Sequence, residues 1–319
     1  MSRYRHNLPQ RRDGRLFLTD GGLETTLIFH QGIDLPDFAA FPLLERPEGQ
    51  AVLLAYFETY VALAVRHQTG LVLETVTWRA NPDWGARLGY DAAALADVNR
   101  RAAAMLEPVR LAHDSATTPI VVSGCVGPRG DGYTPTLVMS PSYAEAYHQP
   151  QIEALAGSSA DLVTAFTLNY VDEAIGIARA ARHADMPVVL SFTVETDGRL
   201  PTGTTIGEAI EAVDADTDGY PAYYMINCAH PTHFEGMLHA DAPWAARIRG
   251  LRANASCRSH AELNEATELD TGNPDDLGSW YATLKQRLPQ LTVLGGCCGT
   301  DHRHVDAIGT ACRRLFAST

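Results

Sequence analysis

Three cysteines are the residues whose type and spacing point most clearly to chemistry. Cys297 and Cys298 are adjacent in the run Gly-Gly-Cys-Cys-Gly, and Cys228 ends an earlier apolar run. Thiolates are soft ligands that suit zinc, and a catalytic zinc uses three protein ligands and leaves one position open. A disulfide between adjacent cysteines is geometrically strained. The pattern therefore predicts a Zn²⁺ site formed by Cys228, Cys297 and Cys298.

The glycines around the cysteine pair predict a turn in the backbone. Successive residues of a strand point to opposite faces, so both sulfurs can face one ion only where the regular strand ends. Gly295, Gly296 and Gly299 supply the conformational freedom for that turn. Taken alone, Cys228 is typical of a small buried hydrophobe, and a redox role is the alternative for the pair.

The elements that must position these residues alternate between strands and helices. Apolar runs of strand length are separated by segments of helical periodicity. The capping patterns Ser142 with Glu145 and Thr205 with Glu208 mark two helix starts. The predicted strands are 16–20, 71–77, 119–125, 161–168, 187–194, 222–228, 247–254 and 291–296, and the predicted helices include 52–68, 142–156, 171–184 and 206–213.

Near-continuous apolar strands that alternate with helices are typical of a parallel sheet covered by helices. Eight such units predict an α/β fold, a single-domain (β/α)₈ TIM-type barrel over 16–319, with 1–15 as a flexible N-terminal tail. An open doubly wound sheet is the alternative. The polar stretch 255–279 lacks clear periodicity and is interpreted as a functional loop.

A barrel of this type gathers its chemistry at the C-terminal ends of its strands. The three cysteines meet this condition. Further polar residues and glycines follow other predicted strands, and all of them are expected on the same rim. These residues are Asp20, Gly21, Gly22, Thr75, Thr77 and Asn254.

The sequence resembles the homocysteine S-methyltransferase family over nearly its whole length. The resemblance rests on Leu-Thr-Asp-Gly-Gly at 18–22, Ile-Asn-Cys at 226–228 and the highly specific Gly-Gly-Cys-Cys-Gly-Thr at 295–300. It implies a (β/α)₈ barrel whose three cysteines bind Zn²⁺. It also implies transfer of a methyl group from a sulfonium or quaternary-ammonium donor, with S-methylmethionine favoured, to homocysteine, which gives methionine.

The chemistry implied by this resemblance is activation of a thiol. Zinc favours the thiolate, which is the nucleophile, so catalysis consists largely of activation and positioning. The backbone at Gly21 and Gly22 is expected to approach the amino acid, and Asp20 to orient its amine. An ordinary strand-end turn is the alternative for Asp20.

One position departs from the family pattern, at the end of the fourth predicted strand. The family commonly places there a glutamate that recognises the amino group of homocysteine, and this chain has Thr167. Glu195, after the fifth predicted strand, is the candidate for a substitute carboxylate, and a solvated side chain is its alternative. A different small thiol or a selenol therefore stays open as acceptor.

Trp78 and Trp84 are candidates for a cage around a cationic donor, but aromatic packing is the favoured interpretation.

Composition narrows the remaining classes of function. A formal net charge of −13 at pH 7 disfavours nucleic acid and anionic membrane surfaces as partners, and no segment is apolar enough to suggest a membrane span. With 6 cysteines in 319 residues, a disulfide scaffold is not expected, so a cytoplasmic enzyme acting on small molecules fits best. The alternative from another class of function is a barrel that binds zinc or senses redox state without catalysing a reaction. The His-rich strand ends of zinc hydrolases are missing, and the oligomeric state stays open.

Overall fold

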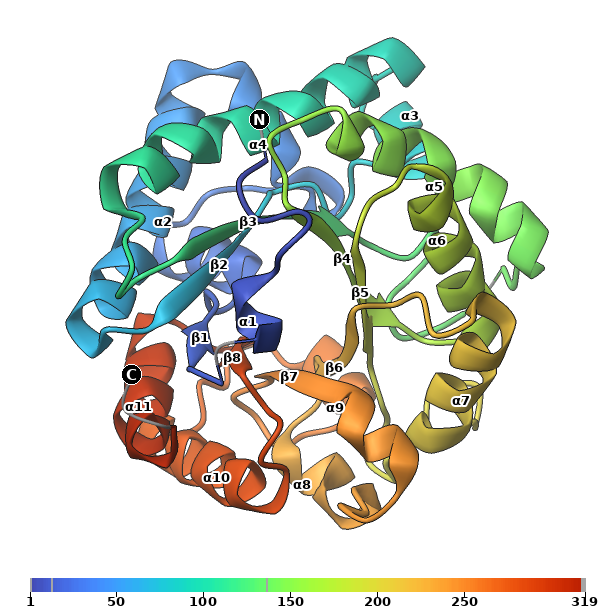
Figure 1. Cartoon of the computed structure of the whole chain (residues 1–319). Coiled ribbons are helices and arrows are strands. Elements are labelled where there is room, and N and C mark those ends of the chain that lie inside the picture. The colour runs from blue at the N-terminus through green and yellow to red at the C-terminus, as the bar shows by residue number, and fades with distance from the viewer. Residues whose placement is uncertain (1, 13, 136, 317–319) are drawn as a thin grey trace.

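Eight parallel strands form a closed barrel in the computed structural model, which describes residues 2–12, 14–135 and 137–316. The strands follow one another around the ring in chain order, and β1 pairs with β8 to close it (Figure 1). This arrangement confirms the predicted (β/α)₈ barrel. The strands are β1 (Phe17–Leu18), β2 (Gly70–Glu74), β3 (Ile120–Val126), β4 (Leu162–Leu168), β5 (Val188–Phe192), β6 (Tyr223–Asn227), β7 (Ile248–Ala253) and β8 (Val293–Gly296).

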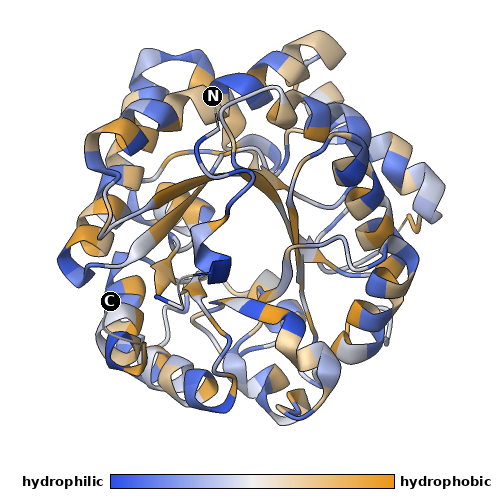
Figure 2. Cartoon of the chain, viewed as in Figure 1, coloured by the Kyte–Doolittle hydropathy of each residue, from blue (hydrophilic) through white to orange (hydrophobic). Residues whose placement is uncertain are grey.

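The strands are buried on both faces. Every residue of β3 and β4 is buried, and the ring of strands in Figure 2 is largely in orange tones, whereas the surrounding helices mix hydrophobic and hydrophilic segments. Such continuous apolar strands need cover on both sides, which helices provide outside the barrel and the strands' own side chains provide inside. The ring closes where Phe17 pairs with Val293 and Leu18 with Leu294.

Helices form the outer ring (Figure 1). The long ones follow or precede the strands that they cover, as the alternating sequence pattern predicts. The α-helices are α1 (Pro9–Arg12), α2 (Pro47–His67), α3 (Pro82–Arg87), α4 (Ala92–His113), α5 (Pro141–Ala156), α6 (Val171–His183), α7 (Ile206–Thr217), α8 (Pro231–Phe234), α9 (His260–Glu265), α10 (Pro274–Arg287) and α11 (His302–Cys312). Short 3₁₀ segments at Pro36–Phe38, Phe41–Glu45, Glu235–Met237, Pro243–Arg247 and Arg313–Leu315 and one π-helical segment at Thr25–His30 join them.

One of the two predicted helix caps is confirmed and the other is wrong. Thr205 and Glu208 form a reciprocal capping box at the start of α7. For α5 the cap is Ser140, whose side chain accepts a hydrogen bond from the N–H of Tyr143, and Ser142 lies inside the first turn. The physical reason is Pro141, because a proline is well suited to the first position of a helix.

The polar stretch 255–279 holds more regular structure than its sequence pattern indicates. It contains α9, which begins with a capping box formed by Ser259 and Glu262. It also contains the start of α10, where Asn273 caps the N–H groups of Asp275 and Asp276. The stretch interpreted as a functional loop therefore contains one short helix and the beginning of another.

The N-terminal segment packs across the N-terminal end of the barrel, in contrast to the predicted flexible tail. Figure 1 shows α1 in front of the centre of the ring. The backbone N–H groups of Arg3 and Tyr4 both donate to Oδ1 of Asp161 at 2.7 Å. The carbonyl of Gln10 accepts a hydrogen bond from the hydroxyl of Thr292 at 2.8 Å. These contacts hold the N-terminal segment, residues 2–12, against the N-terminal end of the barrel, and we call this segment the floor of the barrel.

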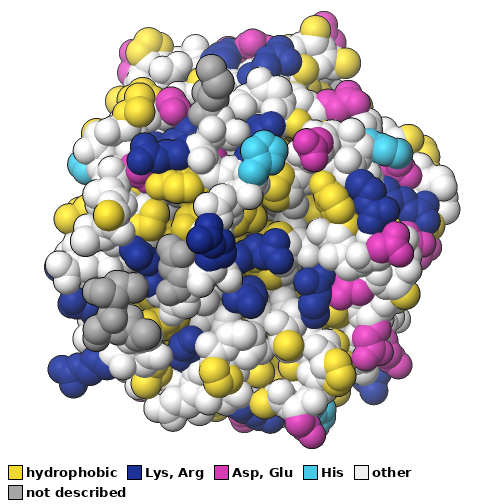
Figure 3. Space-filling model, viewed as in Figure 1, with side chains coloured by type: hydrophobic (Ala, Val, Ile, Leu, Met, Phe, Trp, Pro, Cys, Tyr) yellow, Lys and Arg dark blue, Asp and Glu magenta, His cyan; other side chains and the backbone are white. Residues whose placement is uncertain are grey.

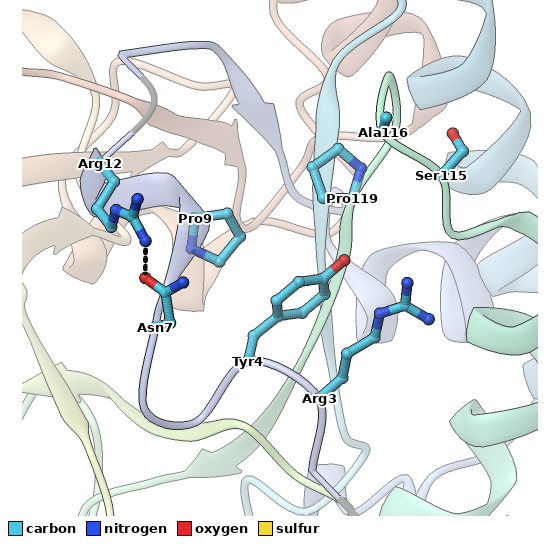
Figure 4. A pocket seen from close by; sticks show the side chains of 8 residues that line it. All are labelled: Arg3, Tyr4, Asn7, Pro9, Arg12, Ser115, Ala116 and Pro119. Atoms are coloured by element: carbon cyan, nitrogen blue, oxygen red, sulfur yellow. Dashed lines mark hydrogen bonds between the residues drawn. The ribbon is translucent and has the colours of Figure 1, made fainter.

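Basic side chains gather on this N-terminal face, as the dark blue groups in Figure 3 show. Two of them are bound by the barrel, since Arg3 contacts Asp114 at 2.8 Å and Arg5 donates to the carbonyl of Ala160 at 2.8 Å. A hollow of about 440 Å³ lies beside them (Figure 4). It is at the opposite end of the barrel from the strand ends that carry the cysteines. Its lining residues are Arg3, Tyr4, Asn7, Pro9, Arg12, Ser115, Ala116 and Pro119.

Within the described residues, none of the helices combines the length and the apolar character that a membrane-spanning segment needs.

Candidate metal centre

The three predicted cysteines converge at the C-terminal end of the barrel. β6 ends at Asn227 and β8 at Gly296, so Cys228 and the Cys297–Cys298 pair directly follow strands. The three sulfur atoms lie within 4.8 Å of one another, and 3.6 Å separates Sγ of Cys228 from Sγ of Cys298. Parallel strands thus bring distant parts of the sequence to one point.

Backbone turns direct the sulfurs toward each other. Cys228 has φ 54°, a left-handed conformation that is uncommon outside glycine and that costs about 1–3 kcal/mol. After the cysteine pair the chain turns at Gly299, which has φ 78°. Gly22 passes so closely that a Cβ there would lie 2.7 Å from the carbonyl oxygen of Cys297. Of the three glycines predicted to permit this turn, Gly299 has a positive φ, whereas Gly295 and Gly296 lie in β8 and have none.

The geometry and the donor type of the cluster fit Zn²⁺. Ligands at the zinc–sulfur distance of about 2.3 Å are about 3.8 Å apart in a tetrahedron. The observed separations, one of 3.6 Å and all within 4.8 Å, are close to this value. Three thiols leave one tetrahedral position open, which is the arrangement of a catalytic zinc site rather than of a four-ligand structural site.

Hydrogen bonds among the three sulfurs shift the pKa values of the cysteines in different directions. Contacts with Cys228 and Cys298 hold the pKa of Cys297 well below its ordinary value, and the guanidinium of Arg252 adds to the effect. The hydrogen bond to Cys297 raises the pKa of Cys228, and contacts with both neighbours raise that of Cys298. A bound cation would stabilise several thiolates at this short distance.

Tyr133 is a site residue that the sequence pattern does not indicate. Its hydroxyl lies 3.4 Å from Sγ of Cys228 and 3.6 Å from Sγ of Cys298. Its ring stacks on the imidazole of His260 with ring centroids 4.0 Å apart, and Nε2 of His260 lies 2.6 Å from the carbonyl oxygen of Cys228. The loop after β3 and the start of α9 therefore close over the cysteines.

Replacing Tyr133 with phenylalanine keeps the ring and removes the hydroxyl. We expect the zinc affinity or kcat/KM to fall about 10- to 100-fold, because groups that support metal ligands typically contribute effects of this size. Zinc affinity measured by competition with a chelator, together with steady-state kinetics, checks this result. The hydroxyl has no role if both quantities match those of the unmodified protein.

Glu195 lies on the same rim but already has a partner. Its Oε1 is 3.3 Å from Nδ1 of His260, and its side chain is 38% exposed. Because His260 stacks on Tyr133, Glu195 is connected to the loop that covers the cysteines. A substrate amine would have to compete with this imidazole for the carboxylate.

Thr167, at the end of β4, is held by Asn227. Oδ1 of Asn227 accepts the backbone N–H of Thr167 at 2.9 Å, and Nδ2 of Asn227 donates to the Thr167 hydroxyl at 2.9 Å. Thr167 has φ 61°, which is unusual for a β-branched residue. Nδ2 of Asn227 also lies 3.9 Å from Sγ of Cys297. Asn227 thus connects Thr167 to the cluster, a role that its place before Cys228 in the sequence could have suggested.

Asp20 is buried near the end of β1, and its carboxylate is in contact with two side chains. Nη2 of Arg252 lies 2.7 Å from Oδ1, and the hydroxyl of Tyr56 donates to Oδ2 at 2.8 Å. Arg252 also donates to the carbonyl groups of Gly21 at 3.0 Å and Gly296 at 2.9 Å. Oδ2 therefore has a hydrogen-bond donor, whereas Oδ1 faces the guanidinium of Arg252 and has no hydrogen-bond partner among the described residues.

The remaining predicted rim residues are buried. The hydroxyl of Thr75 accepts the N–H of Cys125 at 2.9 Å, and the hydroxyl of Thr77 donates to the Cys125 carbonyl at 2.7 Å. The two threonines therefore join the end of β2 to β3. Asn254 follows β7, and its Oδ1 has no hydrogen-bond partner among the described residues.

The rings of Trp78 and Trp84 enclose a cation that belongs to the protein itself. The guanidinium of Arg79 lies 4.2 Å from the Trp78 ring centroid and 3.8 Å from the Trp84 ring centroid. The space that a cationic donor would use is therefore filled. The arrangement agrees with the packing interpretation rather than with a donor cage.

Comparison with known proteins decides the family. Residues 17–312 match the sequence model of a family described as homocysteine S-methyltransferase. The chain belongs to this family. It is therefore an S-methyltransferase by family, as the sequence resemblance predicts. The homocysteine S-methyltransferase of Escherichia coli (strain K12) is 28% identical over 313 residues, which cover 92% of this chain and 94% of that relative.

Solved structures share the fold of this family member. The homocysteine methyltransferase MmuM from Escherichia coli in an oxidized form has a TM-score of 0.72 at 22% identity, covering 94% of this chain and 96% of that chain. Its metallated form also has a TM-score of 0.72, at 21% identity and with the same coverage. At these identities the likeness concerns the barrel fold.

Proposed function

We propose that this methyltransferase transfers a methyl group from a sulfonium donor, with S-methylmethionine favoured, to homocysteine in a zinc-dependent reaction that gives methionine. The observation that carries the proposal is the cluster of three cysteine sulfurs within 4.8 Å of one another at the mouth of the barrel. The family match and the name of the Escherichia coli relative support homocysteine as the acceptor.

Zn²⁺ held by Cys228, Cys297 and Cys298 would favour the thiolate form of an acceptor thiol. The chain's own residues contribute binding and orientation. Tyr133 and His260 cover the cluster, and the positive charge of Arg252 favours a negatively charged sulfur nearby.

The reaction needs no proton donor for the leaving group. The acceptor sulfur forms a bond to the methyl carbon while the bond from that carbon to the donor sulfur breaks. The electron pair of the broken bond stays on the donor, which leaves as a neutral thioether. Catalysis is then a matter of holding donor and acceptor in line.

A small-molecule thiol and a methyl donor are the partners that this chemistry requires. The six cysteines all fall within the described residues and are free thiols. A reducing compartment such as the cytoplasm keeps thiols in this state, so we propose a cytoplasmic location.

A screen of acceptors against donors tests the proposed function. Zinc-loaded protein is mixed with homocysteine, other small thiols and selenols, each with S-methylmethionine, other sulfonium compounds or a quaternary-ammonium donor, and methylated products are measured. We expect the highest turnover with homocysteine and a sulfonium. Activity with none of the pairs would refute the proposal. Turnover with only another thiol or a selenol would identify that compound, and not homocysteine, as the acceptor.

A further inference from the structure

The loop 127–133, which follows β3 and carries Tyr133, is fixed along its first part by side chains from neighbouring loops. Four consecutive backbone carbonyls of this loop each accept a hydrogen bond from a buried or half-buried side chain. The pairs are Nδ2 of Asn81 with Pro128 at 3.3 Å, Nε1 of Trp84 with Arg129 at 3.1 Å, Nη1 of Arg79 with Gly130 at 3.0 Å and Nδ2 of Asn169 with Asp131 at 2.9 Å. The place of Tyr133 then depends on the one residue that follows this fixed stretch, Gly132.

Gly132 is buried against Thr167, and no room is left between them for a side chain. A Cβ atom at position 132 would lie 2.8 Å from Cγ2 of Thr167, whereas the ring of Trp78 would be 3.6 Å away. Carbon atoms in favourable contact are about 3.5–4.0 Å apart. Gly132 is not among the glycines with positive φ, so lack of space, and not backbone conformation, excludes a side chain here.

Thr167 cannot turn its methyl group away without losing a hydrogen bond. Its hydroxyl accepts Nδ2 of Asn227 at 2.9 Å, and a β-branched side chain has few rotamers to adopt. Asn227 is itself fixed, because its Oδ1 accepts the hydroxyl of Ser191 at 2.6 Å and the N–H of Thr167 at 2.9 Å. All three side chains are buried. If a larger residue stood at position 132, the loop would therefore have to move, and not Thr167.

We propose that Gly132 and Thr167 are positioning residues of the metal centre, because their close contact lets Tyr133 reach the cysteines. The hydroxyl of Tyr133 lies 3.4 Å from Sγ of Cys228 and 3.6 Å from Sγ of Cys298. A loop displaced from Thr167 carries this hydroxyl away from the sulfurs, which weakens its support of the metal ligands and uncovers Cys228, now only 4% exposed. The inference rests on the zinc site of the proposed function, and not on the identity of acceptor or donor.

Replacing Gly132 with alanine tests the contact by two measurements. We expect the zinc affinity, measured by competition with a chelator, to fall about 10- to 100-fold, the effect of groups that support metal ligands. In metal-free protein, the rate at which a bulky maleimide modifies Cys228, divided by the rate with iodoacetamide, should rise about 5-fold or more, because the overpacked loop opens. This ratio cancels the fraction of thiolate, and mass spectrometry of peptides separates Cys228 from the other cysteines.

Further variants separate positioning from a general loss of structure. Gly132→Ala combined with Thr167→Ser lacks the obstructing methyl group but keeps the hydroxyl that Asn227 binds, so both quantities should return to within about 3-fold of the unmodified protein. In a Tyr133→Phe protein, Gly132→Ala should lower the zinc affinity by less than about 3-fold more, because the hydroxyl is already absent. Gly236→Ala is the matched control, since a Cβ at that exposed glycine would have nothing within 4 Å.

Three results would overturn the inference while the zinc site stands. They are a folded Gly132→Ala protein with unchanged zinc affinity and Cys228 reactivity, a loss that Thr167→Ser does not restore, and a full further loss in the Tyr133→Phe protein. If Gly132→Ala alone does not fold, recovery of folding and zinc binding by Thr167→Ser supports the contact, and failure to recover overturns it. An unmodified protein that binds no zinc would overturn the proposed function, and the Cys228 reactivity would still test whether Gly132 and Thr167 place the loop.

Discussion

Replacing Cys298 with alanine is expected to remove the bound zinc and methyl transfer together. Cys298 supplies one of three sulfurs within 4.8 Å of one another, so two ligands would remain. The loss in kcat/KM should exceed the about 10- to 100-fold effects of groups that only support metal ligands. Metal analysis of the purified protein and an assay of methylated product measure both quantities, and Cys228→Ala and Cys297→Ala should behave alike.

The matched control is Cys257→Ala. Cys257 is an exposed free thiol that lies outside the cluster, so its replacement should leave about one zinc per chain and full activity. A Cys298→Ala protein that keeps both zinc and turnover would contradict the metal site. A metal-free unmodified protein with a reversible bond between Cys297 and Cys298 would instead favour the redox-sensing alternative.

Replacing Asp161 with alanine should lower the free energy of unfolding by about 3–5 kcal/mol. The side chain of Asp161 is fully buried, and its Oδ2 accepts hydrogen bonds from Nη1 of Arg110 at 2.8 Å and from the N–H of Val122 at 3.0 Å. Its Oδ1 accepts the N–H groups of Arg3 and Tyr4. The substitution therefore removes the acceptor that joins the N-terminal segment, α4 and β3. Unfolding by urea measures the loss.

Asp216→Ala provides the comparison for this experiment. Asp216 pairs with Arg179 through two contacts, at 2.9 and 2.8 Å, but both side chains are partly exposed. Solvent-exposed pairs contribute about 0–1 kcal/mol, so this variant should unfold close to the unmodified protein. Equal losses in the two variants would show that the burial of Asp161 is not what makes its contacts important.

The barrel is largely predictable because burial on both faces forces its strands to be apolar. The predicted strand 119–125 is displaced by one residue from β3, and the predicted strand 161–168 begins one residue before β4 and ends with it. The cysteine cluster is predictable for a related reason. Parallel strands place all their C-terminal ends on one rim, so cysteines that end the sixth and eighth strands must come close.

Contacts made by loops and termini leave no comparable pattern in the sequence from which they could be predicted. Tyr133 and His260 are in contact because the loop after β3 and the start of α9 fold toward each other. No periodicity in the sequence indicates this contact. Trp78 and Trp84 are visible as a pair of aromatic residues, but the placement of Arg79 between their rings depends on how α3 folds back on the end of β2. The N-terminal segment is rich in arginine, and its docking depends on buried partners such as Asp161.

The floor of the barrel also constrains the order in which the chain can assemble. The carbonyl of Gln10 meets the hydroxyl of Thr292, a partner 282 residues later in the sequence. Ribosomal synthesis releases Gln10 long before β8 exists, and contacts between such distant positions form slowly. This contact therefore forms only after the start of β8 has been made, whereas the contacts of Arg3 and Tyr4 with Asp161 can form much earlier.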